Sequence, residues 1–312
     1  MKVVVTGATG HLGRYTVQRL VERGQDVLAL SRAGALPEPP FGAAPALVRA
    51  EACDVTRDSD VERLAAHLGK DVVLVHLAAW HPPSTATTGP AERARLLETN
   101  VLGTMRVLDA ARCAPGGVQA VIYASSFEVY GVPEQAGAVS ESARLNPVSD
   151  YGATKLAGED HLFAFAYEEK SRAVALRFPA VYGPGESTPR ALPNFLRSVA
   201  GGRWPQIHGD GADLRDQIHA RDAALAIECA ISSGASGFYN VADGEPHSIR
   251  ELAETALRVA GMSGPPELLP RQKSRMDFHM NIDKARAELG FRPMVTLEDG
   301  MREQLAWLRA TA

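Results

Sequence analysis

Val3-Val4-Val5-Thr6-Gly7-Ala8-Thr9-Gly10-His11-Leu12-Gly13 is the stretch that decides the fold of this 312-residue chain. Its β-branched run predicts a strand, and its three spaced glycines predict a tight turn. Beyond the turn, Val17, Leu20 and Val21 recur at helical spacing, and Gly24 stands where a helix commonly ends. A strand, a glycine turn and a helix in this order bring backbone N–H groups close to a bound pyrophosphate. The stretch therefore predicts a dinucleotide-binding unit, the alternative being that the glycines only make a turn.

Similar apolar runs follow along the first half of the chain, at residues 27–30, 46–49, 72–77, 121–124 and 174–178. Helical patterns separate them, including a long one from about residue 92 to residue 114. Because the runs are apolar without alternation, they predict parallel strands that are buried on both faces. We therefore expect an α/β fold with a doubly wound parallel (Rossmann) sheet. The proline-rich stretch 36–45 is expected to be a surface loop.

The pattern changes after Phe178. Turn signals such as Gly183-Pro184-Gly185 and Gly209-Asp210-Gly211 separate shorter segments. Residues 238–241 are typical of one more strand of the sheet, and a closing helix is expected from 297 to about 308. We therefore predict a dinucleotide-binding domain formed by residues 1–178 and 218–241. Residues 179–217 and 242–312 are expected to form a smaller substrate-binding lobe.

The composition excludes several classes of protein. Hydrophobic residues make up 45% of the chain, which excludes a disordered protein. The formal net charge of −4 gives no sign of nucleic-acid binding, and no apolar run approaches the roughly 18 residues of a membrane span. Cys53, Cys113 and Cys229 lack the spacing of metal ligands, so reduced thiols and no bound metal are expected. Because the first strand begins at once and leaves no room for a signal peptide, we expect a cytoplasmic protein.

Residues after the second and third predicted strands bear on the choice of cofactor. Ser31 and Arg32 follow the second strand, where an acidic residue would suit the ribose 2′-hydroxyl of NAD and a basic one suits the 2′-phosphate of NADP. They favour NADP over NAD, the alternative being that Arg32 is a solvated loop charge. Asp54, which precedes Val55, has two candidate roles: it accepts a hydrogen bond from the adenine amino group, or it caps the next helix.

Tyr151 and Lys155 stand four residues apart, so on a helix their side chains share one face. Tyrosine has a reference pKa near 10, and a neighbouring cation lowers it by favouring the phenolate. The pair can then exchange a proton with an alcohol oxygen. Taken alone, this spacing also arises by chance.

Several ordered motifs make the chain resemble the extended short-chain dehydrogenase/reductase family, which includes nucleotide-sugar epimerases and dehydratases. They are the glycine loop 6–13, His76 to Ala79, Asn100 to Thr104, Ser125 to Gly131, Tyr151 to Lys155, Leu176 to Gly185, Gly209 to Gly211 with Arg215-Asp216, and Leu289 to Pro293. The resemblance covers nearly the whole chain, and the order of the motifs argues against coincidence.

This resemblance implies roles for four catalytic residues. Tyr151 is implied as the general acid/base, and Lys155 as the residue that binds the nicotinamide ribose and lowers the pKa of Tyr151. Ser126 is implied to hydrogen-bond the reacting oxygen, and Asn100 to order a proton relay; the alternatives are a capping or buried serine and a structural asparagine. The residues expected at the cofactor are Gly7, Thr9, Gly10, His11, Leu12, Gly13, Ser31, Arg32, Asp54, Val55, Leu77, Ala78, Ala79, Asn100, Tyr151, Lys155 and Phe178.

The resemblance also points to a substrate site. Arg215 and Arg271 match family positions that contact a substrate diphosphate, and guanidinium groups suit phosphate oxygens; surface salt bridges are the alternative. Similar 4,6-dehydratases carry an Asp-Glu pair where this chain has Phe127-Glu128, and the missing Asp argues against dehydration. Ala180 departs from the pattern, because many relatives have a substrate-contacting Asn there. The residues expected at the substrate are Trp80, His81, Ser126, Phe127, Glu128, Ala180, Arg215 and Arg271, with loop packing as the alternative for Trp80 and His81.

The expected function is epimerase-type modification of a nucleotide sugar. Tyr151 would remove a hydroxyl proton while hydride passes to the nicotinamide, and the keto intermediate would take hydride back on its other face. A one-way NADPH-dependent ketoreductase is the first alternative, favoured by Ser31 and Arg32. A cofactor-sensing protein without turnover is the second, disfavoured because a sensor needs no proton relay. The resemblance also implies a homodimer formed through the long helices after the fourth and fifth strands; the sugar, the nucleotide and the direction of reaction stay open.

Overall fold

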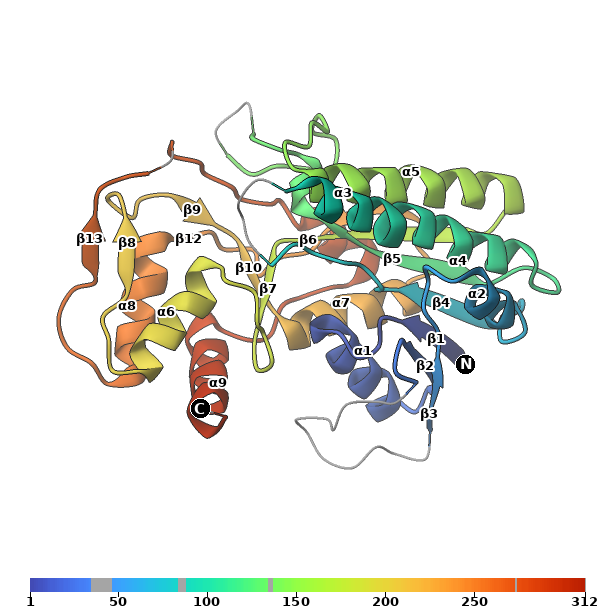
Figure 1. The fold of residues 1–312 in the computed structure, drawn as a ribbon, viewed down its shortest axis with the longest axis horizontal. Helices are drawn as coiled ribbons and strands as arrows, with labels where there is room; N and C mark the ends of the chain where they lie inside the picture. Colours follow the sequence, from blue (N-terminus) through green and yellow to red (C-terminus); the bar gives the residue numbers. More distant parts are fainter. Residues whose placement is uncertain (35–46, 84–87, 134–136, 273, 312) are drawn as a thin grey trace.

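A seven-stranded parallel sheet lies at the centre of the computed structural model, which describes residues 1–34, 47–83, 88–133, 137–272 and 274–311 (Figure 1). Neighbouring strands follow the order β11-β6-β5-β4-β1-β2-β3. The order reverses at β1, the place where ligands bind in such sheets. The strands are β1 (Lys2–Thr6), β2 (Asp26–Ser31), β3 (Val48–Ala52), β4 (Val72–His76), β5 (Ala120–Ser126), β6 (Arg172–Phe178) and β11 (Gly237–Asn240). The predicted doubly wound sheet is confirmed, including its late strand β11.

Helices cover both faces of this sheet. The helices of the described residues are α1 (His11–Glu22), α2 (Asp58–Ala65), α3 (Pro90–Leu96), α4 (Gly103–Arg112), α5 (Asp150–Glu169), α6 (Ala191–Ala200), α7 (Ala220–Ser232), α8 (Ile249–Ala260) and α9 (Leu297–Ala310), with the short helical segments η1 (Leu97–Leu102), η2 (Phe127–Val129) and η3 (Ala285–Leu289). Val3 and Val5 of β1 join an apolar cluster with α1 and α7, whereas Val4 joins a second cluster with α2, α4 and α5. Burial on alternate sides explains why the strand sequences are apolar throughout.

The long helical pattern predicted over residues 92–114 is interrupted in the structure. Helix α3 passes into η1, a π-helical segment, and continues as α4. Such segments widen the helical turn and often occur at functional sites. Asn100 lies within η1 and is buried, so the interruption coincides with a predicted catalytic residue. The predicted loop 36–45 and Ala46, the first residue of the predicted run 46–49, lie outside the described residues.

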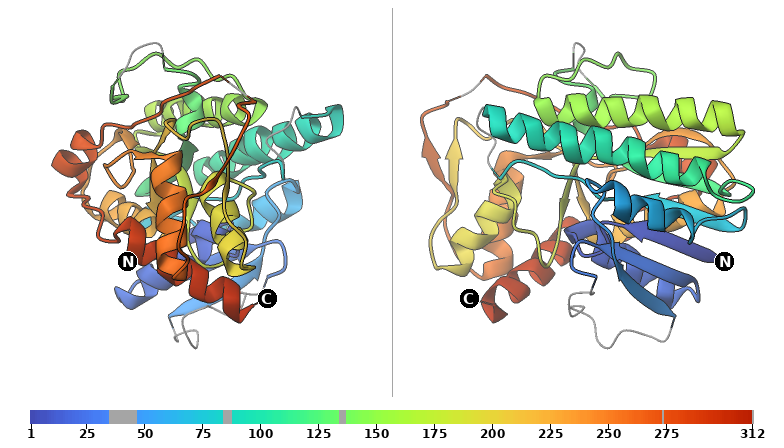
Figure 2. Two further views of the ribbon diagram at one scale, coloured as in Figure 1. Left: turned by 90° about the vertical axis from the view of Figure 1, so that its left-hand side faces the viewer. Right: turned by 45° about the vertical axis from the view of Figure 1, so that its right-hand side comes forward.

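The second part of the chain packs around its own apolar core. Helices α6, α8 and α9 contribute Leu196, Leu252 and Leu305 to this core, and they lie together at one end of the molecule (Figure 2). Three pairs of short strands accompany them: β7 (Ala180–Tyr182) with β10 (Gln217–His219), β8 (Gln206–His208) with β13 (Glu267–Leu269), and β9 (Leu214–Arg215) with β12 (His247–Ser248).

We retain the predicted division into two domains as a proposal, with one detail added. Phe278, Ile282 and Phe291 belong to the apolar cluster of the sheet, although they fall in the range assigned to the substrate lobe. The lobe segment 276–291 therefore runs back over the sheet and ties the two parts together. No helix in the described part of the chain has the length and apolar character that crossing a membrane requires.

Candidate active site

The glycine loop joins β1 to α1 and has little room for side chains. Gly7 adopts φ +69°, and a Cβ at Gly13 would lie 2.2 Å from the Gly7 carbonyl oxygen. Helix α1 begins at His11 after Gly10, without a capping side chain or an acidic residue in its first turn. Its first N–H groups therefore remain open to an anion. The loop fits the pyrophosphate of a dinucleotide.

Neighbouring elements close around this loop. A Cβ at Gly7 would lie 2.6 Å from the Ala78 nitrogen, so the residues after β4, Leu77 and Ala78, lie against it as the cofactor prediction requires. Nδ1 of His11 lies 3.3 Å from Oε2 of Glu186, which comes from the loop before α6. Burial opposes ionisation of Glu186, but its interactions with His11 and with Thr188 lower its pKa to about 2. The predicted cofactor loop is therefore connected to the second part of the chain.

The structure bears on one of the two roles considered for Asp54, that of capping the next helix. Oδ1 of Asp54 accepts hydrogen bonds from the backbone nitrogen and the hydroxyl of Thr56, at 3.0 and 2.8 Å. The residue before α2 is Arg57, so Asp54 caps a turn and not the helix. At the end of β2, Ser31 is buried and Arg32 is exposed. Val55, three residues after β3, and Phe178, the last residue of β6, are buried apolar residues, and their contact with the cofactor stays a prediction.

Asn100 connects three parts of the site. Its Oδ1 accepts from the Trp80 nitrogen at 2.7 Å, and its Nδ2 donates to the Trp80 carbonyl at 2.9 Å and to the Thr154 hydroxyl at 3.1 Å. It thereby joins η1 to the loop after β4 and to α5. These bonds give the asparagine a structural role, and the proton relay stays a prediction.

Helix α5 carries Tyr151 and Lys155 on one face, as their spacing predicted. Ser149 begins the helix by accepting a hydrogen bond from the Gly152 nitrogen at 2.9 Å. Nζ of Lys155 lies 5.7 Å from the centre of the Tyr151 ring and 4.9 Å from that of Tyr123. It donates to the Ala124 carbonyl at 2.8 Å, so β5 fixes the position of the amine.

Burial acts on the ionisation of both Tyr151 and Lys155. Burial raises the pKa of Tyr151, the negative charge of Glu128 raises it further, and Arg190 opposes both. Burial also lowers the pKa of Lys155 to about 7, against the opposing charge of Glu159. Lys155 is not among the groups that set the pKa of Tyr151 here, and the lowering of that pKa by Lys155, which the family resemblance implies, stays a prediction.

Tyr151 lies on the wall of a cavity of about 950 Å³ between the two parts of the chain. The predicted residues that line this cavity are His81, Phe127, Glu128, Tyr151, Ala180 and Arg215. Ser126 is buried at the end of β5, where its Oγ accepts from the Glu128 nitrogen at 3.2 Å. The capping alternative for Ser126 is thus present in the structure. Trp80 lies outside the lining, and the guanidinium of Arg95 stacks on its ring at 4.8 Å.

Arg190 is a cavity residue that the sequence did not identify. Its Nη2 donates to Nε2 of His81 at 3.1 Å and lies 3.9 Å from Oε1 of Glu128. The His81 ring packs on the Tyr151 ring, with centres 4.6 Å apart. Burial opposes ionisation of Glu128, but interactions with His81, Ser149 and Arg190 lower its pKa overall. Glu128, Arg190 and the His81 ring surround the Tyr151 end of the cavity.

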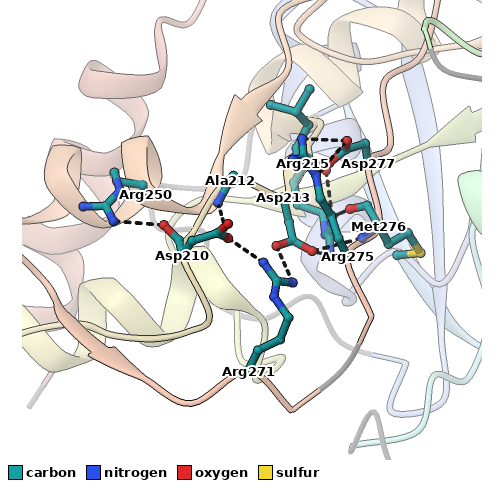
Figure 3. A network of polar contacts seen from close by, with 10 residues as sticks. Asp210, Ala212, Asp213, Arg215, Arg250, Arg271, Arg275, Met276 and Asp277 are labelled. Carbon is teal, nitrogen blue, oxygen red and sulfur yellow. Dashed lines mark hydrogen bonds and ion pairs between the residues drawn. The ribbon is translucent and has the colours of Figure 1, made fainter.

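The two predicted diphosphate ligands differ in position (Figure 3). Arg215 lines the cavity, and its Nη1 donates to the carbonyls of Leu214 and Met276. Arg271 lies outside the lining and pairs with Asp210 at 2.5 Å and with Asp213 at 2.9 Å. The salt-bridge alternative thus describes Arg271 as it stands. Other lining residues that the sequence did not single out include Gln217, Met276 and Phe278.

A metal site is not seen in the described ranges, since no three His, Cys, Asp or Glu side chains gather there in a way that could hold an ion. The chemistry of the site lies instead in two places. The glycine loop can hold a dinucleotide, and Tyr151 can exchange a proton with an alcohol bound in the cavity. This combination defines a Rossmann-fold oxidoreductase.

Comparison with known proteins identifies the family to which the chain belongs. The sequence model of the NAD dependent epimerase/dehydratase family matches residues 3–242, and the chain belongs to this family. The resemblance to the extended short-chain dehydrogenase/reductase family is thereby confirmed.

Three relatives illustrate the range of similar proteins. The UDP-glucose 4-epimerase of Mycolicibacterium smegmatis is 33% identical, with 99% of each chain covered. The dTDP-glucose 4,6-dehydratase of Streptomyces griseus is 32% identical over 98% of this chain and 93% of its own length. The crystal structure of Thermus thermophilus UDP-glucose 4-epimerase, a complex with NAD, superposes with a TM-score of 0.84 at 27% identity and covers 100% of both chains.

Proposed function

We propose that this chain is a nucleotide-sugar epimerase that oxidises a sugar hydroxyl transiently and reduces the resulting ketone on its other face. The observation that carries the proposal is the position of Tyr151 on the wall of a 950 Å³ cavity that also receives Arg215 from the second part of the chain. A proton-transfer group and a guanidinium share one space of a size that suits a nucleotide sugar. The family and the epimerase names of its relatives support the same assignment.

Tyr151 acts as the base and then as the acid in this scheme. Its phenolic oxygen takes the proton of the sugar hydroxyl and later returns it to the ketone oxygen. Ser126 holds the same oxygen from the end of β5, and Lys155 donates to the ribose of the cofactor. A nicotinamide dinucleotide bound on the glycine loop supplies the hydride acceptor and donor.

Arg215 holds the diphosphate of the substrate while the sugar turns. A fixed diphosphate leaves the sugar free to rotate about its bonds to the phosphate, so that either face of the ketone can approach the same hydride. His81, Glu128 and Arg190 border the Tyr151 end and contact the sugar hydroxyl groups.

A dehydratase is disfavoured although some relatives carry that name. Phe127 occupies the position of the dehydratase Asp, and its ring packs on Phe278 with centres 4.8 Å apart. The position is thus apolar and offers no second carboxyl group to remove water from the sugar. Glu128 alone has one carboxyl, and Ser149 donates to it at 2.6 Å.

NADP is the cofactor we propose, with NAD as the alternative carried by several similar structures. Ser31 and Arg32 support this choice, because Arg32 is exposed at the end of β2 and available to a 2′-phosphate. The same observation favours an NADPH-dependent ketoreductase as the second candidate function. A reductase consumes its cofactor stoichiometrically, whereas an epimerase does not.

The decisive experiment is incubation of the purified chain with UDP-glucose, UDP-glucuronic acid or dTDP-glucose. Product stereochemistry is followed by NMR and reduced nicotinamide by absorbance. An inverted sugar centre without net absorbance change is expected. Loss of water from the sugar would identify a dehydratase, and stoichiometric oxidation of NADPH with a keto-sugar would identify a reductase; either result overturns the proposal.

We further propose a homodimer formed through α3, α4 and α5. These helices lie side by side on one face of the sheet (Figure 2). Leu97 and Leu102 of η1 and Tyr167 of α5 are 55%, 41% and 78% exposed, and the proposed contact with a second copy would cover them. Sedimentation equilibrium of the purified chain tests the assembly, and a monomer at micromolar concentration would contradict it.

A further inference from the structure

Glu159 and Arg177 form an ion pair that is almost completely removed from solvent. Their side chains are 0% and 1% exposed. Nη2 of Arg177 donates to Oε2 of Glu159 at 2.6 Å, and Nε donates to Oε1 at 2.9 Å. Burying two charges is costly even when they pair well, and well-packed apolar residues often replace such pairs without loss of stability. We therefore expect this ion pair to have a function in addition to packing.

Every side of this ion pair is hydrogen-bonded. Ser125 donates from its hydroxyl to Oε1 of Glu159 at 2.5 Å. Nη1 of Arg177 donates to the Tyr130 hydroxyl at 2.9 Å, and that hydroxyl donates to Asn240 at 2.7 Å. Ser125 is the neighbour of Ser126 at the end of β5. The carboxylate of Glu159 is thus held in one place beside the site.

Glu159 also continues the row formed by Tyr151 and Lys155. The three residues stand four apart on α5, and side chains at this spacing are neighbours on a helix. A Cβ at Gly158 would lie 2.2 Å from the Tyr123 hydroxyl, so this glycine lets α5 lie directly on β5. The Lys155 amine is held by the Ala124 carbonyl and the Glu159 carboxylate by the Ser125 hydroxyl, so two adjacent residues of β5 fix the two groups next to each other along α5.

The other groups that face Lys155 supply no negative charge. Tyr123 of β5 and Tyr151 of α5 present their rings, and burial raises the pKa of both phenols. His76 of β4 stacks on Tyr123, and burial, with the charge of Lys155, lowers its pKa to about 3, so it is neutral. Arg177 of β6 is positive and lies beyond Glu159. Burial lowers the pKa of Lys155 itself, and Glu159 is the carboxylate that opposes this effect.

We propose that Glu159 is a positioning residue for Lys155: its carboxylate, fixed by Arg177 and Ser125, keeps the Lys155 ammonium charged within the buried site. The importance of that charge rests on the proposed function, in which Lys155 binds the cofactor ribose and supports proton transfer at Tyr151. The site needs a positively charged Lys155 where solvent is excluded. This need explains why the chain bears the free-energy cost of burying the charges of Glu159 and Arg177.

The test is a direct titration of Lys155 by NMR on the full chain with [13C]lysine. The chain has only six lysines, and Lys155→Met identifies the signal. In Glu159→Gln the titration midpoint is expected to fall by about one pH unit or more, because the stabilising carboxylate is lost. Simple loosening of the site would instead raise the midpoint toward the ordinary lysine value of about 10.4. An unchanged or raised midpoint overturns the proposal.

A second pair of variants covers the case in which Glu159→Gln does not fold. Arg177→Gln and the double variant Glu159→Gln/Arg177→Gln both lack the arginine, and they differ only in the carboxylate. The Lys155 midpoint is expected to lie about one pH unit lower in the double variant. Equal midpoints overturn the proposal. Glu168→Gln, an exposed carboxylate on the same helix that pairs with Arg112, is the control and should leave the midpoint unchanged.

Turnover and cofactor affinity are measured across the same pH range. These data distinguish the effect of Glu159 on the charge of Lys155 from the proposed role of Lys155 in the reaction. A midpoint that falls together with an earlier loss of turnover at high pH supports both proposals. If the midpoint falls and turnover keeps its pH profile, the link between Glu159 and Lys155 stands while the catalytic role of Lys155 fails.

Discussion

The cofactor side and the substrate side of the cleft are built in different ways. On the cofactor side, the glycine loop, Asn100 and the Tyr151–Lys155 pair lie at the ends of regular strands or on helices that cover the central sheet. On the substrate side, Arg190, Arg215 and Met276 come from the start of α6, a two-residue strand and an irregular segment. These segments are far apart in the sequence and meet only at the cavity.

This difference indicates that the two sides have different functions. A rigid sheet fixes the atoms that must stay in register with the cofactor, since small displacements there reduce the rate strongly. Irregular segments can vary in length and side chains without disturbing the sheet, so they suit substrate selection. In the proposed function, the reaction type is then set on one side of the cavity and the substrate on the other.

Replacing Tyr151 by Phe is expected to have the largest effect and to act on the cofactor side alone. Loss of the hydroxyl removes the acid/base group, so turnover should fall by at least about 100-fold. Affinities for cofactor and nucleotide sugar, measured by calorimetry, should stay within a few fold. Tyr167→Phe, at an exposed tyrosine of the same helix, is the control and should keep full activity. Turnover close to that of the unmodified chain would rule out the assigned base.

Arg215→Ala is expected to act on the substrate side. A charge-assisted hydrogen bond contributes about 1.5–3 kcal/mol, so the nucleotide-sugar Kd should rise about 10- to 100-fold, with cofactor affinity unchanged. Arg271→Ala is the comparison variant, because its guanidinium pairs with Asp210 and Asp213 at an exposed position. It should change the Kd by no more than about threefold. An equal loss of nucleotide-sugar affinity in both variants would show that Arg271 also belongs to the diphosphate site. A loss of cofactor affinity as large as the loss of nucleotide-sugar affinity would point to misfolding.

The same contrast explains how far the sequence could predict the molecule. Strand runs and the glycine loop are local signals, so the doubly wound parallel sheet and the shared face of Tyr151 and Lys155 followed from them. Arg190 carries no local signal, because only the folded arrangement of the two parts of the chain brings it to His81. The π-helical turn at Asn100 and the raised pKa of Tyr151 likewise depend on burial by distant segments. Arg271 matched a pattern, yet nearby carboxylates hold it away from the cavity.

The pH dependence of stability is a third way to examine the cofactor side. Burial lowers the pKa of Lys155 to about 7, against about 10.4 in an unfolded chain. Between these values the unfolded state binds more protons, so the contribution of Lys155 to the free energy of unfolding rises with pH, by up to about 1.4 kcal/mol per pH unit. Lys155→Met removes this titration. Urea unfolding at pH 7, 8 and 9 should therefore show the unmodified chain gaining stability relative to the variant.

Lys70→Met serves as the control for that measurement, because Lys70 is exposed. Its stability should run parallel to that of the unmodified chain across the same pH range. If Lys155→Met also runs parallel, the amine titrates near its ordinary value and the site is more solvated than its burial indicates.

The smallest expected effect concerns the adenine end of the cofactor. Arg32 is exposed at the end of β2, and its charge is one of those that lower the pKa of Asp54, so the carboxylate partly neutralises it. An exposed charge of this kind contributes at most about 1 kcal/mol. Arg32→Ala should therefore lower the ratio of NADP to NAD affinity by about fivefold, as measured by calorimetric titration with both cofactors.

Arg57→Ala is the matched control, since Arg57 also lowers the pKa of Asp54 but lies at the start of α2 and not at the end of β2. Arg57→Ala should leave the ratio of NADP to NAD affinity unchanged. A general change in the local electrostatic field changes the affinity for both cofactors alike. Only a contact with the 2′-phosphate, which NADP alone carries, changes the ratio. If the unmodified chain binds NAD more tightly than NADP, the cofactor preference is wrong and Arg32 is a solvated loop charge. The cofactor side would then be fixed entirely by the sheet ends and the glycine loop, with no contribution from the strand-end arginine.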